Sequence, residues 1–385
     1  MKICSVICEF NPFHNGHQYF LQRAREITSC DYLLCIMSSS FTQRGEIAVI
    51  DKYTRAKHAV LGGADCVLEL PAIFSVAPAE IFTKGAIKII SAIPSINALA
   101  FGCENADKNE LLNTAKLLGK ENNEFKNFLS EELKSGQSYI KSYLNAFEKI
   151  GGNNKILQQP NNILAIEYIK AINYTNNDIE IFPVKRIGAD FNDGELKENF
   201  SSASAIRQNS NSPKIINNVP PFVFKDLKSF SKENELYEKL LKLILSRTDS
   251  ADLKKIYGCT EGLENTLKHL ENLTFNQIID KSTSKRYPSS RIKRILCANF
   301  LGLYKKDCEI ILKSNLYLTP LAVKKESAAT ILSELAKSQY PIITSGSDIQ
   351  KLNTQSLKCK KLDDFAFKQW QQITEKSLTS KMLTI

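Results

Sequence analysis

The fold is decided by the stretch Ile3-Cys4-Ser5-Val6-Ile7-Cys8-Glu9-Phe10-Asn11-Pro12-Phe13-His14-Asn15-Gly16-His17. Its first part, Ile3 to Ile7, is an apolar run that predicts a buried strand. A helix is predicted from Gly16 to about Thr28, because Tyr19, Phe20, Leu21 and Ile27 are spaced like one helical face. Asn-Pro and Asn-Gly mark the turn between the two. In an open parallel sheet such strand-to-helix turns bind ligands, and the free N–H groups at a helix start favour phosphate.

Strand-like and helix-like segments alternate through the first half of the chain. Strands are predicted at 32–37, 66–70, 98–102 and 179–184, and helices at 52–61 and 79–90. This alternation predicts an α/β fold with a parallel sheet and helices on both faces.

The composition changes in the middle of the chain. Residues 208–213 are rich in Asn and Ser, and Pro220-Pro221 follows, so we expect an inter-domain linker there. Beyond it, apolar residues recur at helical spacing over 233–245, 261–270 and 291–303. We therefore expect one domain over residues 1–210 and a second, mainly α-helical domain over residues 211–385.

The net charge and the cysteines indicate what kind of partner the protein binds and in which compartment it works. The 385 residues include 51 Lys and Arg against 41 Asp and Glu, a net charge of +10 that favours a polyanionic partner. The ten cysteines are scattered, several inside apolar runs, which indicates reduced core thiols and a cytoplasmic location. No signal peptide and no membrane span is expected, because the N-terminal apolar run is short and no apolar stretch is long enough.

His14 and His17 allow three interpretations. In the first, they make only local hydrogen bonds or are a chance pair. In the second they form a His-x-x-His metal site, and in the third they bind phosphate. A zinc site needs further ligands, but the only other histidines are His58 and His269, and no Cys-x-x-Cys occurs, so we expect no metal held by the protein. In the phosphate interpretation Gly16 lets the backbone approach the phosphates, and the imidazoles stabilise charge as it builds at phosphorus.

A family resemblance strengthens the phosphate interpretation. His14-Asn15-Gly16-His17 resembles the HIGH motif of the nucleotidyltransferase superfamily. The longer stretch from Glu9 to His17, followed by Met37 to Glu46, resembles the bacterial tRNA(Met) cytidine acetate ligase family. The resemblance continues, in order, through Asp51 to Ala56, Gly63 to Pro71, Phe101-Gly102-Cys103-Glu104, Pro160 to Tyr168 and Lys185-Arg186-Ile187-Gly188-Ala189, with a weaker echo at Lys285 to Arg294.

The resemblance implies a Rossmann-like nucleotidyltransferase domain that binds ATP. Ser201 to Arg207 is similar to the second superfamily motif, of the Ser-Ser-Thr-x-Ile-Arg type, although Ala203 and Ser204 depart from it. The implied catalytic residues are therefore His14, His17 and Arg207. The implied ATP-binding residues are Ile7, Cys8, Glu9, Phe10, Asn11, Pro12, Phe13, His14, Asn15, Gly16, His17, Gln18, Tyr19, Phe20, Gly102, Asn162 and Arg186.

Several of these residues also have a plain structural interpretation. Gly102 suits an ordinary turn at a strand end, Asn162 a helix cap, and Arg186 a surface cation. The neighbouring Asn161 is a near-equal candidate for the role given to Asn162. The motif ending at Arg207 also reads as a helix N-cap followed by an exposed arginine.

The polar loop after the second strand is a candidate pocket for the second substrate. Ser40 and Arg44 are the candidates for contacting acetate, although Arg44 fits a loop salt bridge equally well. Asp51, Lys52 and Arg55 open the next helix, and either line the site or lie beside it.

A basic segment in the second half of the chain favours RNA as the binding partner. Residues 281–306 contain no acidic residue and combine cations with Tyr287, which suits an RNA backbone and a stacked base. The candidate RNA-binding residues are Lys285, Arg286, Arg291, Lys293 and Arg294. The alternative is an ordinary solvated helix face.

The family resemblance implies a specific reaction. ATP, with Mg²⁺, activates acetate as acetyl-adenylate, and the acetyl group passes to N4 of the wobble cytidine, position 34, of elongator tRNA(Met). Two alternatives remain from the residues themselves: a small-molecule adenylyltransferase of coenzyme biosynthesis, and a non-catalytic RNA-binding protein.

Overall fold

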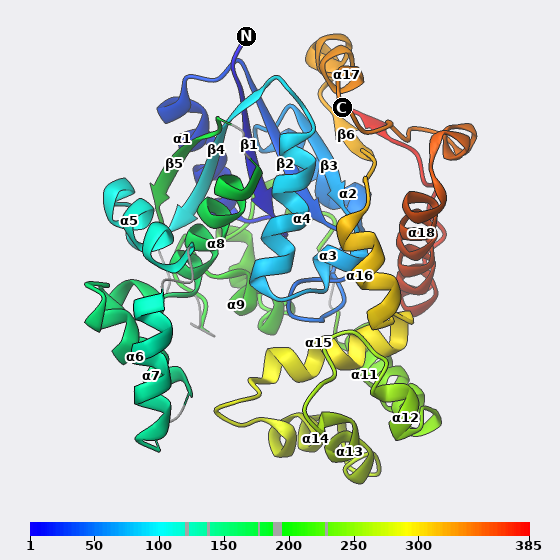
Figure 1. Cartoon of the computed structure of the whole chain (residues 1–385). Coiled ribbons are helices and arrows are strands. Elements are labelled where there is room, and N and C mark those ends of the chain that lie inside the picture. The colour runs from blue at the N-terminus through cyan, green and yellow to red at the C-terminus, as the bar shows by residue number, and fades with distance from the viewer. Residues whose placement is uncertain (120–122, 137–138, 176–177, 188–194, 228–229) are drawn as a thin grey trace.

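A seven-stranded sheet forms the centre of the computed structural model, which describes residues 1–385 except 120–122, 137–138, 176–177, 188–194 and 228–229 (Figure 1). The strand order is β5-β4-β1-β2-β3-β6-β7, and the first five of these strands are parallel. The strands are β1 Ile3–Cys8, β2 Tyr32–Ser38, β3 Cys66–Leu70, β4 Ile96–Cys103, β5 Glu180–Lys185, β6 Pro320–Val323 and β7 Leu383–Thr384. The predicted α/β fold is confirmed.

The chain reverses its direction across the sheet between β1 and β4. It runs outward from β1 through β2 to β3, then returns to place β4 on the other side of β1. In open α/β sheets ligands bind at the carboxyl ends of the strands that flank such a switch point. The topology therefore places the expected site at the ends of β1 and β4.

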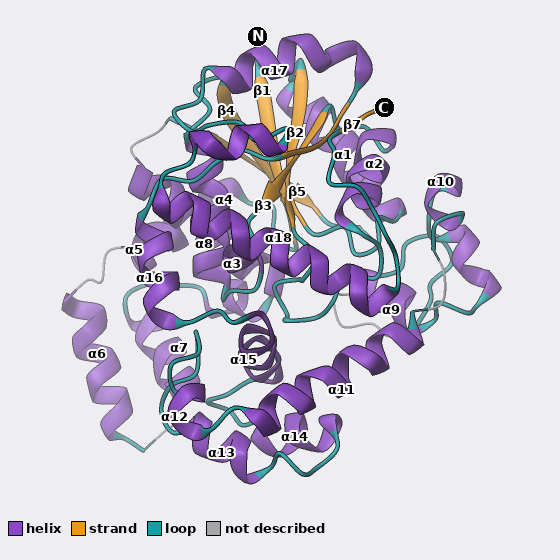
Figure 2. Ribbon diagram, turned by 90° about the vertical axis from the view of Figure 1, so that its right-hand side faces the viewer, coloured by secondary structure: helices purple, strands orange, loops and turns teal. Residues whose placement is uncertain are grey.

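Helices cover both faces of the sheet, as Figures 1 and 2 show. α4 and α8 pack together on one face, and α1 and α2 lie on the other. Because both faces are covered, the central strands are continuous apolar runs, which is why they could be located from sequence. The first-half helices are α1 Asn15–Thr28, α2 Lys52–Leu61, α3 Ala72–Ser75, α4 Ala79–Ser91, α5 Lys108–Gly119, α6 Asn123–Lys134, α7 Tyr139–Lys149, α8 Pro160–Thr175 and α9 Ala203–Gln208, with a 3-10 turn at Asn154–Gln158.

The second half is mainly helical, as predicted. Its α-helices are α10 Pro221–Phe224, α11 Ser231–Arg247, α12 Ser250–Leu253, α13 Leu263–His269, α14 Phe275–Ser282, α15 Ser289–Leu301, α16 Lys305–Lys313, α17 Ala328–Ala336 and α18 Thr354–Thr374, with 3-10 turns at Pro213–Asn217, Lys325–Ser327 and Gly346–Lys351. The group α11 to α15 lies beyond the carboxyl edge of the sheet (Figure 1). None of the helices described is long and apolar enough to cross a membrane.

The C-terminal part also returns to the sheet. β6 pairs antiparallel with β3, and β7 pairs with β6. α18 packs on the first half, where the indole N–H of Trp370 donates to the carbonyl of Ala48 at 2.7 Å. These short strands were not expected, because a run of four residues carries no periodicity that separates a strand from other structure. The division into residues 1–210 and 211–385 stays a proposal.

The segment expected to be a linker is packed against the first half. The backbone N–H of Asn15 donates to the carbonyl of Asn218 at 3.0 Å, and the Asn218 side chain accepts from the N–H of Ser201 at 2.9 Å. Asn218 is buried. The segment therefore helps to hold the start of α1. All ten cysteines are unpaired, nine of them buried and Cys8 partly buried.

Candidate active site

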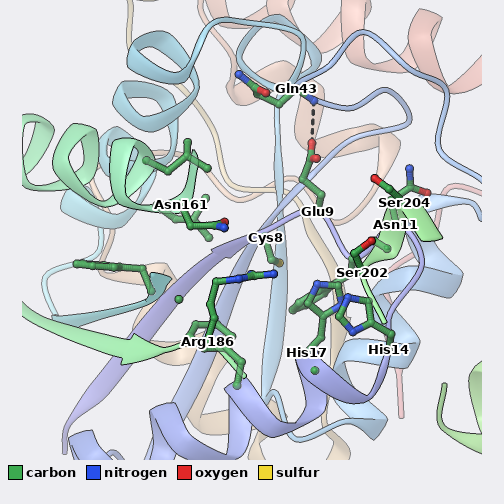
Figure 3. Close-up of a pocket in the computed structure, with 18 of the residues that line it drawn as sticks. Cys8, Glu9, Asn11, His14, His17, Gln43, Asn161, Arg186, Ser202 and Ser204 are labelled. Atoms are coloured by element: carbon green, nitrogen blue, oxygen red, sulfur yellow. Dashed lines mark hydrogen bonds between the residues drawn. The ribbon is translucent and has the colours of Figure 1, made fainter. Parts of the chain in front are cut away.

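A cavity of about 250 Å³ opens at the carboxyl ends of β1, β4 and β5 (Figure 3). It is lined by residues from the β1–α1 turn, the loop after β2, α8 and the start of α9. The predicted site residues that line it are Ile7, Cys8, Glu9, Phe10, Asn11, His14, Gly16, His17, Tyr19, Phe20, Arg44, Gly102, Arg186 and Arg207. Residues 188 and 189, which end one of the quoted sequence blocks, lie outside the described residues.

His14 and His17 lie against each other at the start of α1. Their rings stack, with centroids 3.6 Å apart and planes 24° apart. His14 is the N-cap residue, and its carbonyl accepts from the N–H of His17 at 2.9 Å. Both Nδ1 atoms are buried and have no hydrogen-bond partner among the described residues. Buried polar atoms are nearly always paired in folded proteins, so these two nitrogens point to a bound ligand.

The two imidazoles are neutral in the free protein. Burial, together with the smaller effects of the cations Arg186 and Arg207, lowers the pKa of His14 to about 3. Burial and then the neighbouring His14 hold the pKa of His17 well below its usual value. A bound polyphosphate would supply the opposite charge and favour protonation of these rings.

Gly16 lies close against the histidine ring beside it. A Cβ at this position would lie 3.0 Å from Cε1 of His14 and 3.1 Å from its Nδ1. Close approach of a phosphate is the predicted reason for this glycine, and the contact that the structure shows is with the imidazole. Gly16 therefore allows His14 to adopt its position over the helix start.

Aromatic side chains fix the turn that carries the histidines. Phe10 packs against Phe13 at 5.0 Å and against His17 at 4.8 Å between ring centroids. Phe13 is fully buried and fills the space next to Gly62, and Pro12 is also buried. Pro12 and Phe13, both proposed to bind ATP, therefore build the turn and do not line the cavity.

Asn15 and Gln18 also lie away from the cavity wall. The Asn15 amide donates to the carbonyl of Asn217 at 2.8 Å and to that of Asn199 at 3.2 Å, which ties α1 to the segments before and after α9. Gln18 is exposed on the outer face of α1. Neither side chain is among those that line the cavity.

Arg207 reaches the β1–α1 turn from α9. Ser202 caps this helix by accepting from the N–H of Ala205 at 3.0 Å. The Arg207 guanidinium donates to the carbonyl of Asn11 at 2.8 Å and lies 3.3 Å from both Glu46 and the Ser204 hydroxyl. The structure thus brings Arg207 to the turn that carries His14 and His17, although its contact Asn11 in that turn lies 196 positions away in the chain.

Gly102 and Arg186 both line the cavity, and the Arg186 side chain extends towards His17 (Figure 3). A Cβ at Gly102 would lie 3.5 Å from Cγ of Arg186 and 3.9 Å from the Phe20 ring, both ordinary contacts. The surrounding protein therefore does not require glycine here, and the open space beside it suits a ligand. The apolar part of the lining, here called the apolar wall, consists of residues that were not predicted as site residues: Phe82, Phe101, Leu164, Tyr168, Val184 and Ile187. Phe101, Leu164, Tyr168 and Ile187 lie within the quoted family blocks, but their apolar character does not separate them from core residues.

The side chains of the two neighbouring asparagines, Asn161 and Asn162, face different surroundings. Asn161 lines the cavity, and its amide donates to Glu104. Asn162, the residue proposed to bind ATP, is turned to the protein, where its oxygen accepts from the N–H groups of Glu104 and Asn105, each at 3.0 Å. Asn162 therefore shapes the loop after β4, and Asn161 is the one positioned to contact a ligand.

The loop after β2 forms one side of the cavity. Thr42, Gln43, Arg44 and Glu46 line it, whereas Ser40 is buried and does not. Gln43 donates its backbone N–H to Glu9 at 2.7 Å. Burial raises the pKa of Glu9 above its usual value, although this hydrogen bond acts in the opposite direction. Gln43 and Glu46 belong to the loop predicted to form the pocket for the second substrate, although only Ser40 and Arg44 of this loop are predicted to contact acetate.

Lys52 and Arg55 belong to a buried polar cluster behind this loop, outside the cavity lining. Lys52 donates to both oxygens of Glu69 at 2.6 and 2.8 Å, and the Ser39 hydroxyl donates to the same carboxylate at 2.6 Å. Arg55 is fully buried and donates to the carbonyls of Ile50, Glu9 and Ser39. Through these bonds to Glu9 and Ser39, Arg55 and the Lys52–Glu69 pair fix the start of the loop after β2.

The five basic candidates for RNA binding divide into two groups. Lys293 donates to Glu46 at 3.0 Å and Arg294 to the carbonyl of Gln43 at 3.3 Å, so both contact the cavity loop from α15. Arg286 pairs with Glu261, and Arg291 donates to Thr260; both guanidinium groups lie over the Tyr287 ring. Lys285 is exposed. The basic segment therefore begins at the cavity wall and continues onto the surface.

Comparison with known proteins identifies relatives over the full length of the chain. The family described as HIGH nucleotidyl transferase matches residues 1–382. A tRNA(Met) cytidine acetate ligase from Clostridium botulinum (strain Langeland) is 36% identical over 388 residues, covering 93% of this chain and 94% of the relative. A protein of the same name from Thermoanaerobacter sp. (strain X514) is 36% identical over 363 residues, covering 91% and 90%.

Solved structures agree with these relatives. Thermotoga maritima TmcAL in its apo form superposes with a TM-score of 0.92 at 28% identity, and both chains are covered completely. The same Thermotoga protein bound with alpha-thio ATP superposes with a TM-score of 0.89 over the same coverage.

Proposed function

The chain belongs to the HIGH nucleotidyltransferase family, as a tRNA(Met) cytidine acetate ligase, and we propose that it forms acetyl-adenylate and acetylates N4 of the wobble cytidine at position 34 of elongator tRNA(Met). The observation that carries this proposal is the pair of unpartnered imidazole nitrogens beside Arg207. They form a buried site for a polyanion at the switch point of the sheet. The relative bound with an ATP analogue supports ATP as that polyanion.

In the proposed first step, a carboxylate oxygen of acetate attacks the α-phosphorus of ATP. The bond from this phosphorus to the oxygen bridging to the β-phosphorus breaks, and pyrophosphate leaves. His14, His17 and Arg207 are placed to stabilise the negative charge that spreads over the phosphoryl oxygens. Burial makes each of these interactions stronger than it would be in water.

In the proposed second step, the N4 amine of the cytidine attacks the acetyl carbon. The bond from that carbon to the phosphate oxygen breaks, AMP leaves, and one proton is lost from the nitrogen. No protein nucleophile takes part. The base has to leave its stack to reach the cavity, as is general for enzymes that modify a base.

We place the substrates along the cavity by the chemistry of its walls. The nucleoside of ATP lies beside Gly102, Arg186 and the apolar wall, and its phosphates extend towards His14 and His17. Arg44 is proposed to contact acetate, because a guanidinium pairs well with a carboxylate. Ser40 was the second candidate for this contact, but it does not line the cavity.

Mg²⁺ is proposed to accompany ATP. This ion is usually held by one or two carboxylates together with the substrate phosphates, and it neutralises part of the phosphate charge. Glu9 lines the cavity and supplies an oxygen donor of the right type. A cation beside Glu9 would also favour its ionised form, which burial disfavours in the free protein.

The tRNA is proposed to lie along the basic segment. Arg286 and Arg291 flank Tyr287 on the surface, and the segment leads to the cavity through Arg294 and Lys293. Cations suit the phosphate backbone and the tyrosine suits an unstacked base. The proposed location of the reaction is the cytoplasm.

The proposal is tested by acetate-dependent exchange of labelled pyrophosphate into ATP. Exchange is expected in the wild type only when acetate is present, and it is expected to be lost in His17→Ala. Absence of exchange with acetate in protein that still binds ATP, both with and without tRNA, would rule out the proposed activation step. Exchange that requires a nucleotide or phosphopantetheine acceptor instead of acetate would favour a coenzyme adenylyltransferase.

A further inference from the structure

Glu46 lies between two cations from opposite halves of the chain. One of its oxygens lies 3.3 Å from the Arg207 guanidinium, and the other accepts from Nζ of Lys293 at 3.0 Å. The three side chains are only 22%, 26% and 31% exposed for Arg207, Glu46 and Lys293. Glu46 also lines the cavity. A continuous ionic chain therefore runs from the proposed phosphate site to α15.

Backbone packing fixes the place of Lys293 in this chain. Gly45, next to Glu46, adopts a φ of +73°, and a Cβ there would lie 2.7 Å from backbone atoms of Lys293 and Arg294. The Gly45 carbonyl also accepts from the buried hydroxyl of Tyr237 at 3.0 Å. The loop and α15 are thus in direct backbone contact, and the Lys293–Glu46 pair is not a chance pairing of two long surface side chains.

We propose that Glu46 is a positioning residue for Arg207 and that Lys293 offsets the charge of Glu46, so that helix α15 completes the ATP site. This inference rests on the proposed function. A carboxylate beside a triphosphate repels it and competes with it for Arg207. Lys293 reduces both effects, while Glu46 still orients the guanidinium. Lys293 therefore serves the ATP site before any RNA is bound.

The electrostatics of the pair agree with this role. Burial acts to raise the pKa of Glu46, but Arg207, Lys293 and, to a smaller extent, Arg44 outweigh it and hold the pKa below its usual value. Glu46 is therefore an anion at neutral pH, and its charge has to be offset when a polyanion enters the cavity.

The test measures the Kd of ATP by calorimetry, without acetate and without tRNA, in a double-mutant cycle. Lys293→Met is expected to raise the Kd about fivefold, the effect of losing one partly exposed charge pair. In the Glu46→Gln background the same substitution is expected to have no effect, because no carboxylate remains to be offset. Lys293→Arg keeps the charge and should bind ATP like the wild type, which separates loss of charge from loss of folding.

Glu46→Gln itself separates positioning from a merely structural role. It is expected to leave the Kd of ATP unchanged or lower, while the exchange rate at saturating ATP falls about tenfold because Arg207 is no longer held in place. Lys239→Met is the matched control, an exposed lysine on α11 paired with Glu235, and should change nothing.

Two outcomes would overturn the inference. One is an unchanged Kd in Lys293→Met, and the other is an equal rise in both backgrounds. Because the Kd is measured without acetate or tRNA, these outcomes are independent of the ligase reaction. A wild type that binds ATP without acetate-dependent exchange would contradict the proposed function and leave the Kd comparison as it stands.

Discussion

Two buried polar clusters lie near the carboxyl edge of the sheet, and they differ in how their atoms are paired. In the cluster behind the β2 loop, Lys52 and Glu69 bond to each other, and Arg55 is bonded to three carbonyls. In the cluster at the β1–α1 turn, the Nδ1 atoms of His14 and His17 have no partner in the described part of the chain. A buried polar atom without a partner costs free energy, and a bound ligand can supply the missing partner.

The largest effect is expected from breaking the paired cluster. Lys52→Met leaves Glu69 charged, buried and without its cation, and should lower the free energy of unfolding by about 3–5 kcal/mol. Denaturation by urea measures this loss. The double variant Lys52→Met/Glu69→Leu should recover most of it, because two apolar residues can replace a buried pair. If Lys52→Met were as stable as the wild type, the paired cluster would not have the stabilising role that the comparison gives it.

The next effect concerns the unpaired cluster and falls on activity. His17→Leu replaces the ring with an apolar side chain of similar volume. We expect the rate of pyrophosphate exchange to fall about 10²–10³-fold, the usual result of removing one preorganised donor from a transition state. The free energy of unfolding should stay the same or rise by about 1 kcal/mol, because an unpartnered polar atom is removed. A large loss of stability would place His17 with the structural cluster instead.

The unpaired histidines should also make stability depend on pH. The folded pKa of His14 is lowered from 6.5 to about 3, so the unfolded chain binds protons that the folded chain does not. Stability is therefore complete above pH 6.5 and decreases as the pH falls towards 3. Between pH 6.5 and pH 5 the expected loss from His14 is about 2 kcal/mol.

This pH dependence is checked by urea denaturation at several pH values. His14→Gln should show a shallower decrease than the wild type over this range, and saturating ATP should reduce the decrease in the wild type, because phosphate favours the protonated rings. Equal slopes in the wild type and in His14→Gln would contradict the assignment.

The smallest effect is expected for two adjacent residues, Asn161 and Asn162, of which one faces the cavity and the other is paired within the protein. Asn162 holds two backbone N–H groups, so Asn162→Ala should lower the free energy of unfolding by about 1–3 kcal/mol. Asn161 faces the cavity, so Asn161→Ala should raise the Kd of ATP by about tenfold or less and change stability little. The two variants are controls for each other, and a reversed pattern would return the ATP-binding role to Asn162.

Local sequence patterns located the first half of the fold well. The helix over 52–61 and the strand over 66–70 were predicted with the bounds that the structure shows, because a buried strand and an amphipathic helix each leave a regular spacing of apolar residues. The strands β6 and β7 left no such pattern. Their pairing depends on a long return of the chain to the edge of the sheet, which local spacing does not encode.

Motifs identified the main candidate site residues, but not how each side chain is placed. His14, His17 and Arg207 were recognised from two short motifs, and the structure brings them together. The same motifs gave no indication that Pro12 and Phe13 build the turn, that Gly16 makes room for a ring, or that Asn161 and not Asn162 faces the cavity. These distinctions depend on the direction of side chains after packing.

By itself the sequence determined the α/β class and the strand-to-helix turn, because these follow from residue spacing over short distances, and it predicted a polyanion site at that turn. Only the tertiary structure decided which polar atoms are paired. Glu46 and Lys293 are separated by 247 positions, and nothing in either segment indicates that they meet. A charge becomes structural or functional according to its neighbours and its exposure to water, and both are set by the packing of distant segments.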